Sequence, residues 1–122
     1  MKDSEFSDFI EKVRDQTDII QVIIPPITII RMIELTGKDY PIVLALYCFY
    51  YLTARRQKTN QPWASDSYCM NGLGWSGGRF YKAKKLLLQH RFIEIVKKSR
   101  NANGTFGKTY VKVCYMSNGR HN

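Results

Sequence analysis

The sequence predicts an α+β fold, mainly α-helical, in which a three-helix core is followed by a β-hairpin. Three observations predict it: a long apolar segment at 40–54, two shorter segments that each follow a serine, and two alternating segments around Asn103-Gly104. The 122 residues, of which 44% are hydrophobic, suffice to bury the core of one domain. We expect this domain over 39–115, an N-terminal extension over 1–38 and a flexible tail over 116–122.

The N-terminal extension contains three apolar segments. Residues 4–15 have apolar side chains at helical spacing, and residues 18–24 are rich in β-branched side chains, which predicts a helix followed by a strand. Residues 27–35 fit either a helix that starts after two prolines or an extended segment, and we expect a short helix. The isoleucines of this extension must be buried, either against the domain or in a dimer interface.

The first core helix is expected to begin at Asp39, whose side chain would cap it, with Pro41 in its first turn. Apolar side chains lie all around it as far as residue 54, which indicates a helix buried on nearly every side. Three basic residues follow at its C-terminal end, where cations interact favourably with the helix dipole. They are Arg55, Arg56 and Lys58.

Two shorter helices follow in the predicted core. Ser65 would cap a helix over 66–73, and Ser76 would cap a helix that runs to about His90, after a turn over 72–76. The inner face of the later helix is predicted to consist of Phe80, Ala83 and Leu87.

The hairpin is predicted from alternation between apolar and polar side chains in 92–97 and 108–115. A turn over 99–107, which contains Asn103-Gly104, would join these segments as antiparallel strands. Val111 and Val113 would then lie on one face of the return strand, with Tyr110 and Lys112 on the other.

The positive charge of the chain is concentrated in its second half. Residues 76–115 contain ten Lys and Arg and one acidic residue, whereas residues 1–75 contain eight Lys and Arg and nine Asp and Glu. The formal net charge is +9. Such a one-sided segment is typical of a surface that binds a polyanion, although a basic face that serves solubility is the alternative.

Several classes of protein are disfavoured by the sequence. Acidic residues in the N-terminal stretch argue against a signal peptide, and the apolar segment over 40–54 is short and aromatic for a membrane span. The three cysteines have no close spacing, which favours buried, reduced thiols and a cytoplasmic location; they are Cys48, Cys69 and Cys114.

No catalytic or cofactor motif is convincing. Gly72, Gly74 and Gly77 match the dinucleotide-binding spacing, but the segment before them is not a hydrophobic strand. The His, Cys and acidic residues lack the spacing of metal ligands, and no serine has a His and an acidic residue in a catalytic context. We therefore expect no enzyme activity, no cofactor, no metal and no small-molecule substrate.

The order of elements from residue 39 resembles the winged helix-turn-helix family of DNA-binding proteins. The resemblance covers about 39–115 and is carried by the capped second helix, the turn Leu73-Gly74-Trp75-Ser76, the basic third helix and the Asn-Gly hairpin. Residues 87–93 are similar to the exit from the recognition helix of this family. They depart from it in having His90-Arg91 where glycine is usual.

This resemblance implies that the third helix enters the major groove of double-stranded DNA and that the hairpin, or wing, touches the backbone or the minor groove. Arg79 would read guanine, Lys82 and Lys85 would neutralise phosphates, and Tyr81 would do either. The implied contacts of the helix are Ser76, Gly77, Gly78, Arg79, Tyr81, Lys82 and Lys85. Those of the wing are Lys97, Lys98, Arg100, Asn101, Asn103 and Lys108.

Sequence-specific DNA binding by a transcriptional regulator is therefore the expected function. An origin-binding replication protein of a phage, virus or plasmid is an alternative within DNA binding. From another class, a protein-interaction module would present the same basic face to an acidic partner. A homodimer is favoured because domains that read the groove commonly bind as symmetric pairs.

Overall fold

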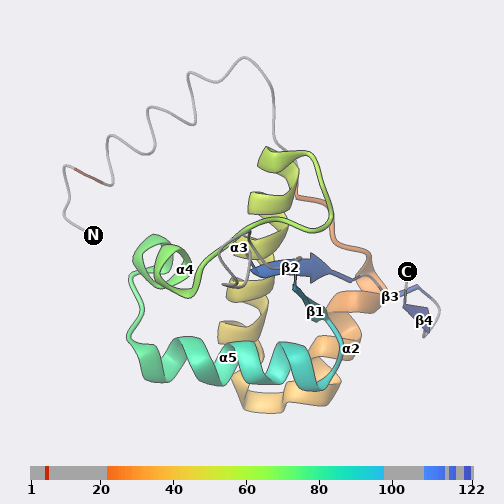
Figure 1. Ribbon diagram of the computed structural model, residues 1–122. Coiled ribbons are helices and arrows are strands. Elements are labelled where there is room, and N and C mark those ends of the chain that lie inside the picture. Colours follow the sequence, from red (N-terminus) through yellow and green to blue (C-terminus); the bar gives the residue numbers. More distant parts are fainter. Residues whose placement is uncertain (1–4, 6–21, 98–108, 115, 118–119, 122) are drawn as a thin grey trace.

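The computed structural model describes residues 5, 22–97, 109–114, 116–117 and 120–121. It is a mainly helical α+β structure (Figure 1). The helices are α2 (Pro26–Thr36), α3 (Tyr40–Gln57), α4 (Asp66–Leu73) and α5 (Gly77–Gln89), and a single 3-10 turn, Gly37–Asp39, joins α2 to α3. The strands are β1 (Ile93–Lys97), β2 (Thr109–Val113), β3 (Met116–Ser117) and β4 (Arg120–His121).

Helix α3 lies at the centre of the core. Every residue of 42–54 is at least half-buried, which confirms the prediction of a helix covered on nearly all sides. Its most deeply buried side chains include Val43, Leu46, Tyr47 and Tyr50. Helix α5 packs against α3, and its predicted inner face of Phe80, Ala83 and Leu87 is fully buried. These contacts fix α5 on the core by one face and leave its opposite face to solvent.

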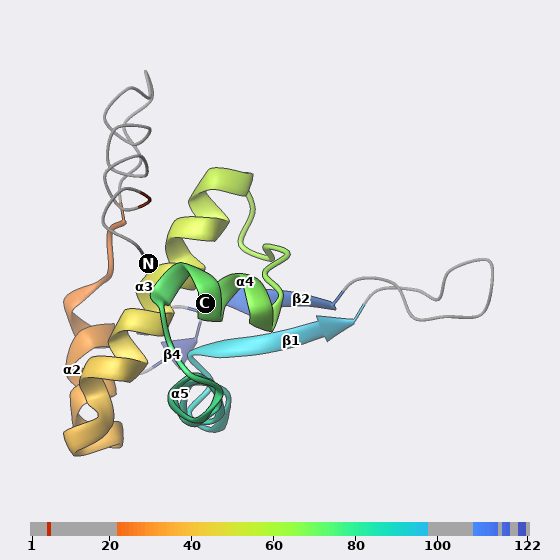
Figure 2. The ribbon, with the colours of Figure 1, turned by 90° about the vertical axis from the view of Figure 1, so that its left-hand side faces the viewer.

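The hairpin forms as predicted in the strands that the structure describes. β1 pairs antiparallel with β2, with Ile93 opposite Val113 and Lys97 opposite Thr109. Ile93, Val111 and Val113 are buried against the helices. The Asn103-Gly104 turn lies outside the described residues. Figure 2 shows the two strands extending away from the helices on the side opposite α2.

The loop between α3 and α4 borders the other edge of β2. The amide of Val111 donates to the carbonyl of Pro62 at 3.0 Å, and the amide of Val113 donates to that of Asn60 at 2.8 Å. Trp63 forms an isolated antiparallel bridge with Tyr110. The hairpin is thus hydrogen-bonded to the chain segment between two helices as well as packed on them.

Three helices end in the same backbone motif. At the end of α5 the amide of Phe92 donates to the carbonyl of Leu87 at 2.9 Å, and Arg91 takes a left-handed conformation with φ of 61°. This motif normally places glycine at the left-handed residue. Glycine occupies that position after α4, at Gly74, whereas α3 uses Lys58 with φ of 57°. Arg91 therefore provides, with a non-glycine residue, the left-handed turn that ends α5.

Several expectations about local structure are wrong. Asp39 does not cap α3, because its side chain makes no capping hydrogen bond. Ser76 occupies the N-cap position of α5 but likewise makes no capping bond, whereas Ser65 Oγ accepts from the Tyr68 amide at 3.1 Å as expected. The expected tail contains the paired strands β3 and β4, and β3 lies against α2.

The N-terminal extension is partly described. The short helix expected at 27–35 is confirmed as α2. The strand expected over 18–24 is wrong for 22–24, which form no regular structure before Pro25 and Pro26, and its remaining residues lie outside the described part. The helix expected over 4–15 lies, apart from Glu5, outside it too. None of the described helices has the length and apolar content needed to span a membrane.

Candidate nucleic-acid interface

Helix α5 follows α4 through a tight turn. Gly74 ends α4 with φ of 67°, and the amide of Trp75 donates back to the carbonyl of Met70 at 3.0 Å. A left-handed residue without a side chain lets the chain reverse here without steric strain. Lys84 Nζ then lies 2.7 Å from Asp66 Oδ1, so that an ion pair joins α5 to the first turn of α4. The two helices are held at a fixed angle by this turn and this pair.

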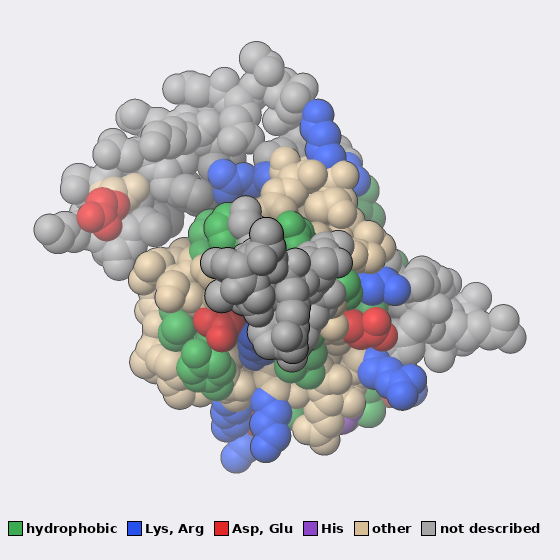
Figure 3. Space-filling view, viewed as in Figure 1, with side chains coloured by type: hydrophobic (Ala, Val, Ile, Leu, Met, Phe, Trp, Pro, Cys, Tyr) green, Lys and Arg blue, Asp and Glu red, His purple; other side chains and the backbone are tan. Residues whose placement is uncertain are grey.

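The outer face of α5 is basic and exposed. Gly78, Lys82, Lys85 and Gln89 follow one another at helical spacing, and all four are exposed on the side opposite the buried face. Figure 3 shows Lys and Arg side chains projecting from the lower edge of the molecule, where Figure 1 places α5. Gln89 was missed by the sequence reasoning, although its position four residues after Lys85 places it on the same stripe.

Arg79 and Tyr81 flank this stripe on its two sides. The guanidinium carbon of Arg79 lies 6.0 Å from the centre of the Trp75 ring, within the range of a cation–π contact. Tyr81 is 53% exposed and its ring packs edge-on against Phe80, with centroids 5.1 Å apart. Each side chain is thus exposed while it contacts a neighbouring ring.

Lys82 forms an ion pair within the chain. Its Nζ lies 3.2 Å from Asp39 Oδ1, and the two side chains are 55% and 26% exposed. Asp39 belongs to the 3-10 turn before α3, so the pair joins α5 to the start of the central helix. A phosphate that approached Lys82 would have to share or displace this carboxylate.

The first turn of α5 exposes backbone. Ser76 and Gly78 are exposed and Gly77 is half-buried. A Cβ at Gly78 would meet no atom within 4 Å, and one at Gly77 would contact Tyr81 at 3.7 Å. The amides of a first helical turn lack partners within the helix, and they bind anions readily.

The expected wing contacts lie almost entirely outside the described residues. Lys97 ends β1, and its backbone pairs with Thr109 of β2. The others fall in 98–108 and are not described: Lys98, Arg100, Asn101, Asn103 and Lys108. The described site therefore consists of α5 and the turn before it.

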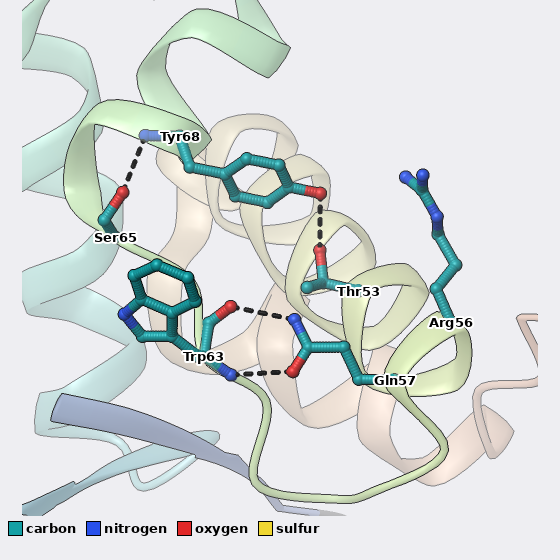
Figure 4. A pocket seen from close by; sticks show the side chains of 6 residues that line it. All are labelled: Thr53, Arg56, Gln57, Trp63, Ser65 and Tyr68. Carbon is teal, nitrogen blue, oxygen red and sulfur yellow. Dashed lines mark hydrogen bonds between the residues drawn. The ribbon is translucent and has the colours of Figure 1, made fainter. Parts of the chain in front are cut away.

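A pocket of about 410 Å³ lies between the end of α3, the following loop and α4. Figure 4 shows its six lining side chains, which are Thr53, Arg56, Gln57, Trp63, Ser65 and Tyr68. The Gln57 amide clamps the backbone of Trp63: its Nε2 donates to the Trp63 carbonyl and its Oε1 accepts from the Trp63 amide, both at 2.9 Å. This clamp fixes the loop that pairs with β2, and it was missed because side-chain amides carry no spacing signal.

The three thiols are free, and two of them are buried: Cys69 and Cys114, whereas Cys48 is half-buried. Burial raises the pKa of the Cys69 thiol to about 11 and raises the pKa values of the other two. Such thiols are protonated at neutral pH and react slowly. Within the described ranges, no three His, Cys, Asp or Glu side chains gather in a way that would hold a metal ion.

No protein-family model, curated protein or solved structure matches this chain.

Proposed function

We propose that the chain binds double-stranded DNA in a sequence-specific manner as a winged helix-turn-helix protein, and that it acts as a transcriptional regulator. The observation that carries the proposal is the exposed basic face of α5. Its opposite face is buried through Phe80, Ala83 and Leu87, so the core holds the helix by one face and the basic face points to solvent. The major groove of B-DNA has a width of about 12 Å, which admits such a helix.

The arrangement of the elements supports the same proposal. Two helices joined by a tight turn are followed directly by an antiparallel hairpin, which is the order of the winged helix-turn-helix family. The hairpin would lie beside the groove that α5 enters, and the residues of its tip would meet the backbone. Because the charged face lies on a helix, A-form RNA is a poor fit, since its deep and narrow major groove excludes helices.

The side chains on α5 would have different roles in DNA recognition. Arg79 has a planar fork of donors that engages both acceptors of guanine, and Trp75 restrains it. Lys82 and Lys85 are point charges that suit phosphate oxygens, and the free amides after Ser76 suit another phosphate. Gln89 has an amide that matches the adenine edge, at the far end of the same stripe.

The experiment that tests the proposal has two stages. A randomised duplex library is first selected on the full chain, and the enriched sequence is then titrated at several salt concentrations. We expect it to bind at least tenfold more tightly than a scrambled duplex, with a log–log salt slope of about −3 or steeper, since each neutralised phosphate contributes about −0.9.

The matched variants are Lys85→Ala on α5 and Arg55→Ala at the exposed end of α3. Lys85→Ala should weaken binding, and Arg55→Ala should not. A salt slope near zero, or equal effects of the two variants, would overturn the assignment of α5 as the DNA-binding face. Binding to an acidic protein without binding to DNA would instead support the interaction-module alternative.

A further inference from the structure

Helix α2 has an inverted distribution of polar and apolar side chains. Its buried positions are Thr28, Met32 and Thr36, which are 0%, 1% and 8% exposed. Ile30 and Ile33 lie on the opposite side and are 49% and 43% exposed. A helix that packs once against a core normally buries its isoleucines and exposes its threonines.

The buried face of α2 is well satisfied, so a simple rotation of the helix would not improve its packing. Thr36 Oγ1 donates to the carbonyl of Met32 at 2.7 Å, and Met32 belongs to the core cluster. Rotation would remove this methionine from the core cluster and expose it to water. The outward isoleucines therefore form a second apolar face rather than a misplaced first one.

Apolar side chains are also exposed just before the helix. Ile23, which precedes Pro25 and Pro26, is 64% exposed, and Val22 is 38% exposed. Single exposed apolar residues are ordinary on protein surfaces, but a contiguous stripe rimmed by charges is typical of an interface. Figure 2 shows α2 at the left-hand edge of the molecule, with the hairpin extending to the right. A partner on α2 would therefore leave the hairpin uncovered.

The charges beside the stripe favour a second copy of the chain as the partner. Arg31 and Glu34 lie on one flank, with Arg31 Nη1 3.4 Å from Glu34 Oε2 and both side chains about half exposed. A two-fold interface needs a self-complementary patch. If two α2 helices pack antiparallel about an axis between residues 32 and 33, each Arg31 meets the Glu34 of the other copy, and the isoleucines meet across the axis.

We propose that the chain forms a symmetric homodimer through the outward faces of α2. Ile30 and Ile33 form its apolar centre, and the Arg31–Glu34 pairs exchange between copies at its rim. This inference stands on α2 alone and does not depend on DNA binding by α5.

The test measures the mass of the full chain by sedimentation from about 1 to 100 µM. We expect the chain to reach twice its mass of 14.3 kDa within this range. Ile30→Ser should weaken association at least tenfold. The matched control is Leu35→Ser, a residue of the same helix that is 39% exposed but lies away from the stripe, and it should associate like the unchanged chain.

A charge exchange identifies the second copy as the partner. Arg31→Glu and Glu34→Arg should each weaken self-association, because like charges then face each other across the axis. Mixing the two variant chains should restore a dimer, since opposite charges then meet at both contacts. Circular dichroism verifies that each variant is folded.

A monomeric unchanged chain at 100 µM would overturn the proposal. So would charge variants that associate normally, or a mixture that stays monomeric, because either result means that something other than a second α2 covers this face. DNA titration of Ile30→Ser separates the two proposals: a monomer that binds DNA with a lower apparent affinity leaves the role of α5 intact.

Discussion

Lys82 Nζ lies 3.2 Å from Asp39 Oδ1, which joins the proposed DNA-binding helix to the turn before the central helix. The carboxylate therefore competes with phosphate for this lysine. Asp39→Asn removes the competitor and a nearby negative charge, and an exposed pair of this kind is worth about 0.2–1 kcal/mol. We expect the affinity for DNA to rise by up to about fivefold, measured by titration of one duplex. In a Lys82→Ala background the same substitution should give a smaller gain; an equal gain would show that the pair plays no part.

Arg79 and Lys85 should affect DNA binding in different ways. Arg79→Ala should lower the preference for the selected sequence over a scrambled one, with a loss of about 1–3 kcal/mol of discrimination. Lys85→Ala should lower the affinity for both sequences alike. It should also make the log–log salt slope less steep by about 0.9, which is the contribution of one phosphate. The ratio of the two dissociation constants, measured for each variant, distinguishes these outcomes. Parallel loss of both sequences in Arg79→Ala would remove its role in base readout.

Gly72 and Gly78 form a matched pair for separating stability from binding. A Cβ at Gly72 would clash with Cζ of Phe49, whereas a Cβ at Gly78 would meet nothing within 4 Å. Gly72→Ala should therefore destabilise the fold by about 1–3 kcal/mol in denaturant unfolding, despite the higher helix propensity of alanine. Gly78→Ala should keep or raise the stability and weaken DNA binding, because its methyl group would stand between the helix and the groove. Unchanged binding would mean that this turn does not approach DNA closely.

Tyr47 and Tyr50 differ in how their buried hydroxyl groups are satisfied. Tyr47 Oη donates to the carbonyl of Cys114 at 2.7 Å and joins α3 to the end of the hairpin. Tyr50 Oη is buried beside Cys69 and has no hydrogen bond of ordinary geometry in the described part of the chain. Tyr47→Phe should lower the free energy of unfolding by about 1–3 kcal/mol, since a buried carbonyl loses its donor. Tyr50→Phe should be neutral or stabilising, and a loss as large as that of Tyr47→Phe would show that its hydroxyl is paired after all.

The stability of the fold should fall at alkaline pH because of Cys69. Its thiol is fully buried, and this burial raises its pKa from 9.0 to about 11. The unfolded chain releases this proton above about pH 9 while the folded chain retains it. The contribution is therefore present below pH 9 and is lost as the pH rises towards 11, at up to about 1.4 kcal/mol per pH unit.

Denaturant unfolding between pH 8 and 10.5 measures this slope. Cys69→Ala should flatten it, and Cys48→Ala, at a half-buried position, should flatten it less. Above pH 10 the Tyr50 hydroxyl adds to the decline, because burial raises its pKa beyond the usual range. An identical slope in Cys69→Ala would show that its thiol ionises normally in the folded chain.

The helices and the hairpin could be predicted because their signals are local. The bounds of α4, 66–73, follow from the serine before it and the glycine after it, and the buried face of α5 follows from its spacing. The strands β1 and β2 follow from alternation over a few residues. In each case the local sequence contains both the residues that favour the helix or strand and the residues that end it.

The remaining features depend on residues that are distant in sequence. The Asp39 side chain turns to Lys82 instead of capping its own helix, and no local pattern reveals that partner. The orientation of α2 was equally unpredictable, since threonines face inward and isoleucines outward. Residues 60–63 have the composition of an ordinary loop. In the folded chain their carbonyls nevertheless accept hydrogen bonds from amides of β2.

Strand β2 has a consequence for the order in which the fold assembles. Its amides bond the loop after α3, its side chains fill the core, and Tyr47 reaches the residue that follows it. Ribosomes make β2 after all of α2 to α5, so these contacts of high sequence separation cannot form until the helices have been synthesised. Folding should consequently be limited by the docking of this strand, and a nascent chain that stops before Thr109 should present an open apolar surface to chaperones.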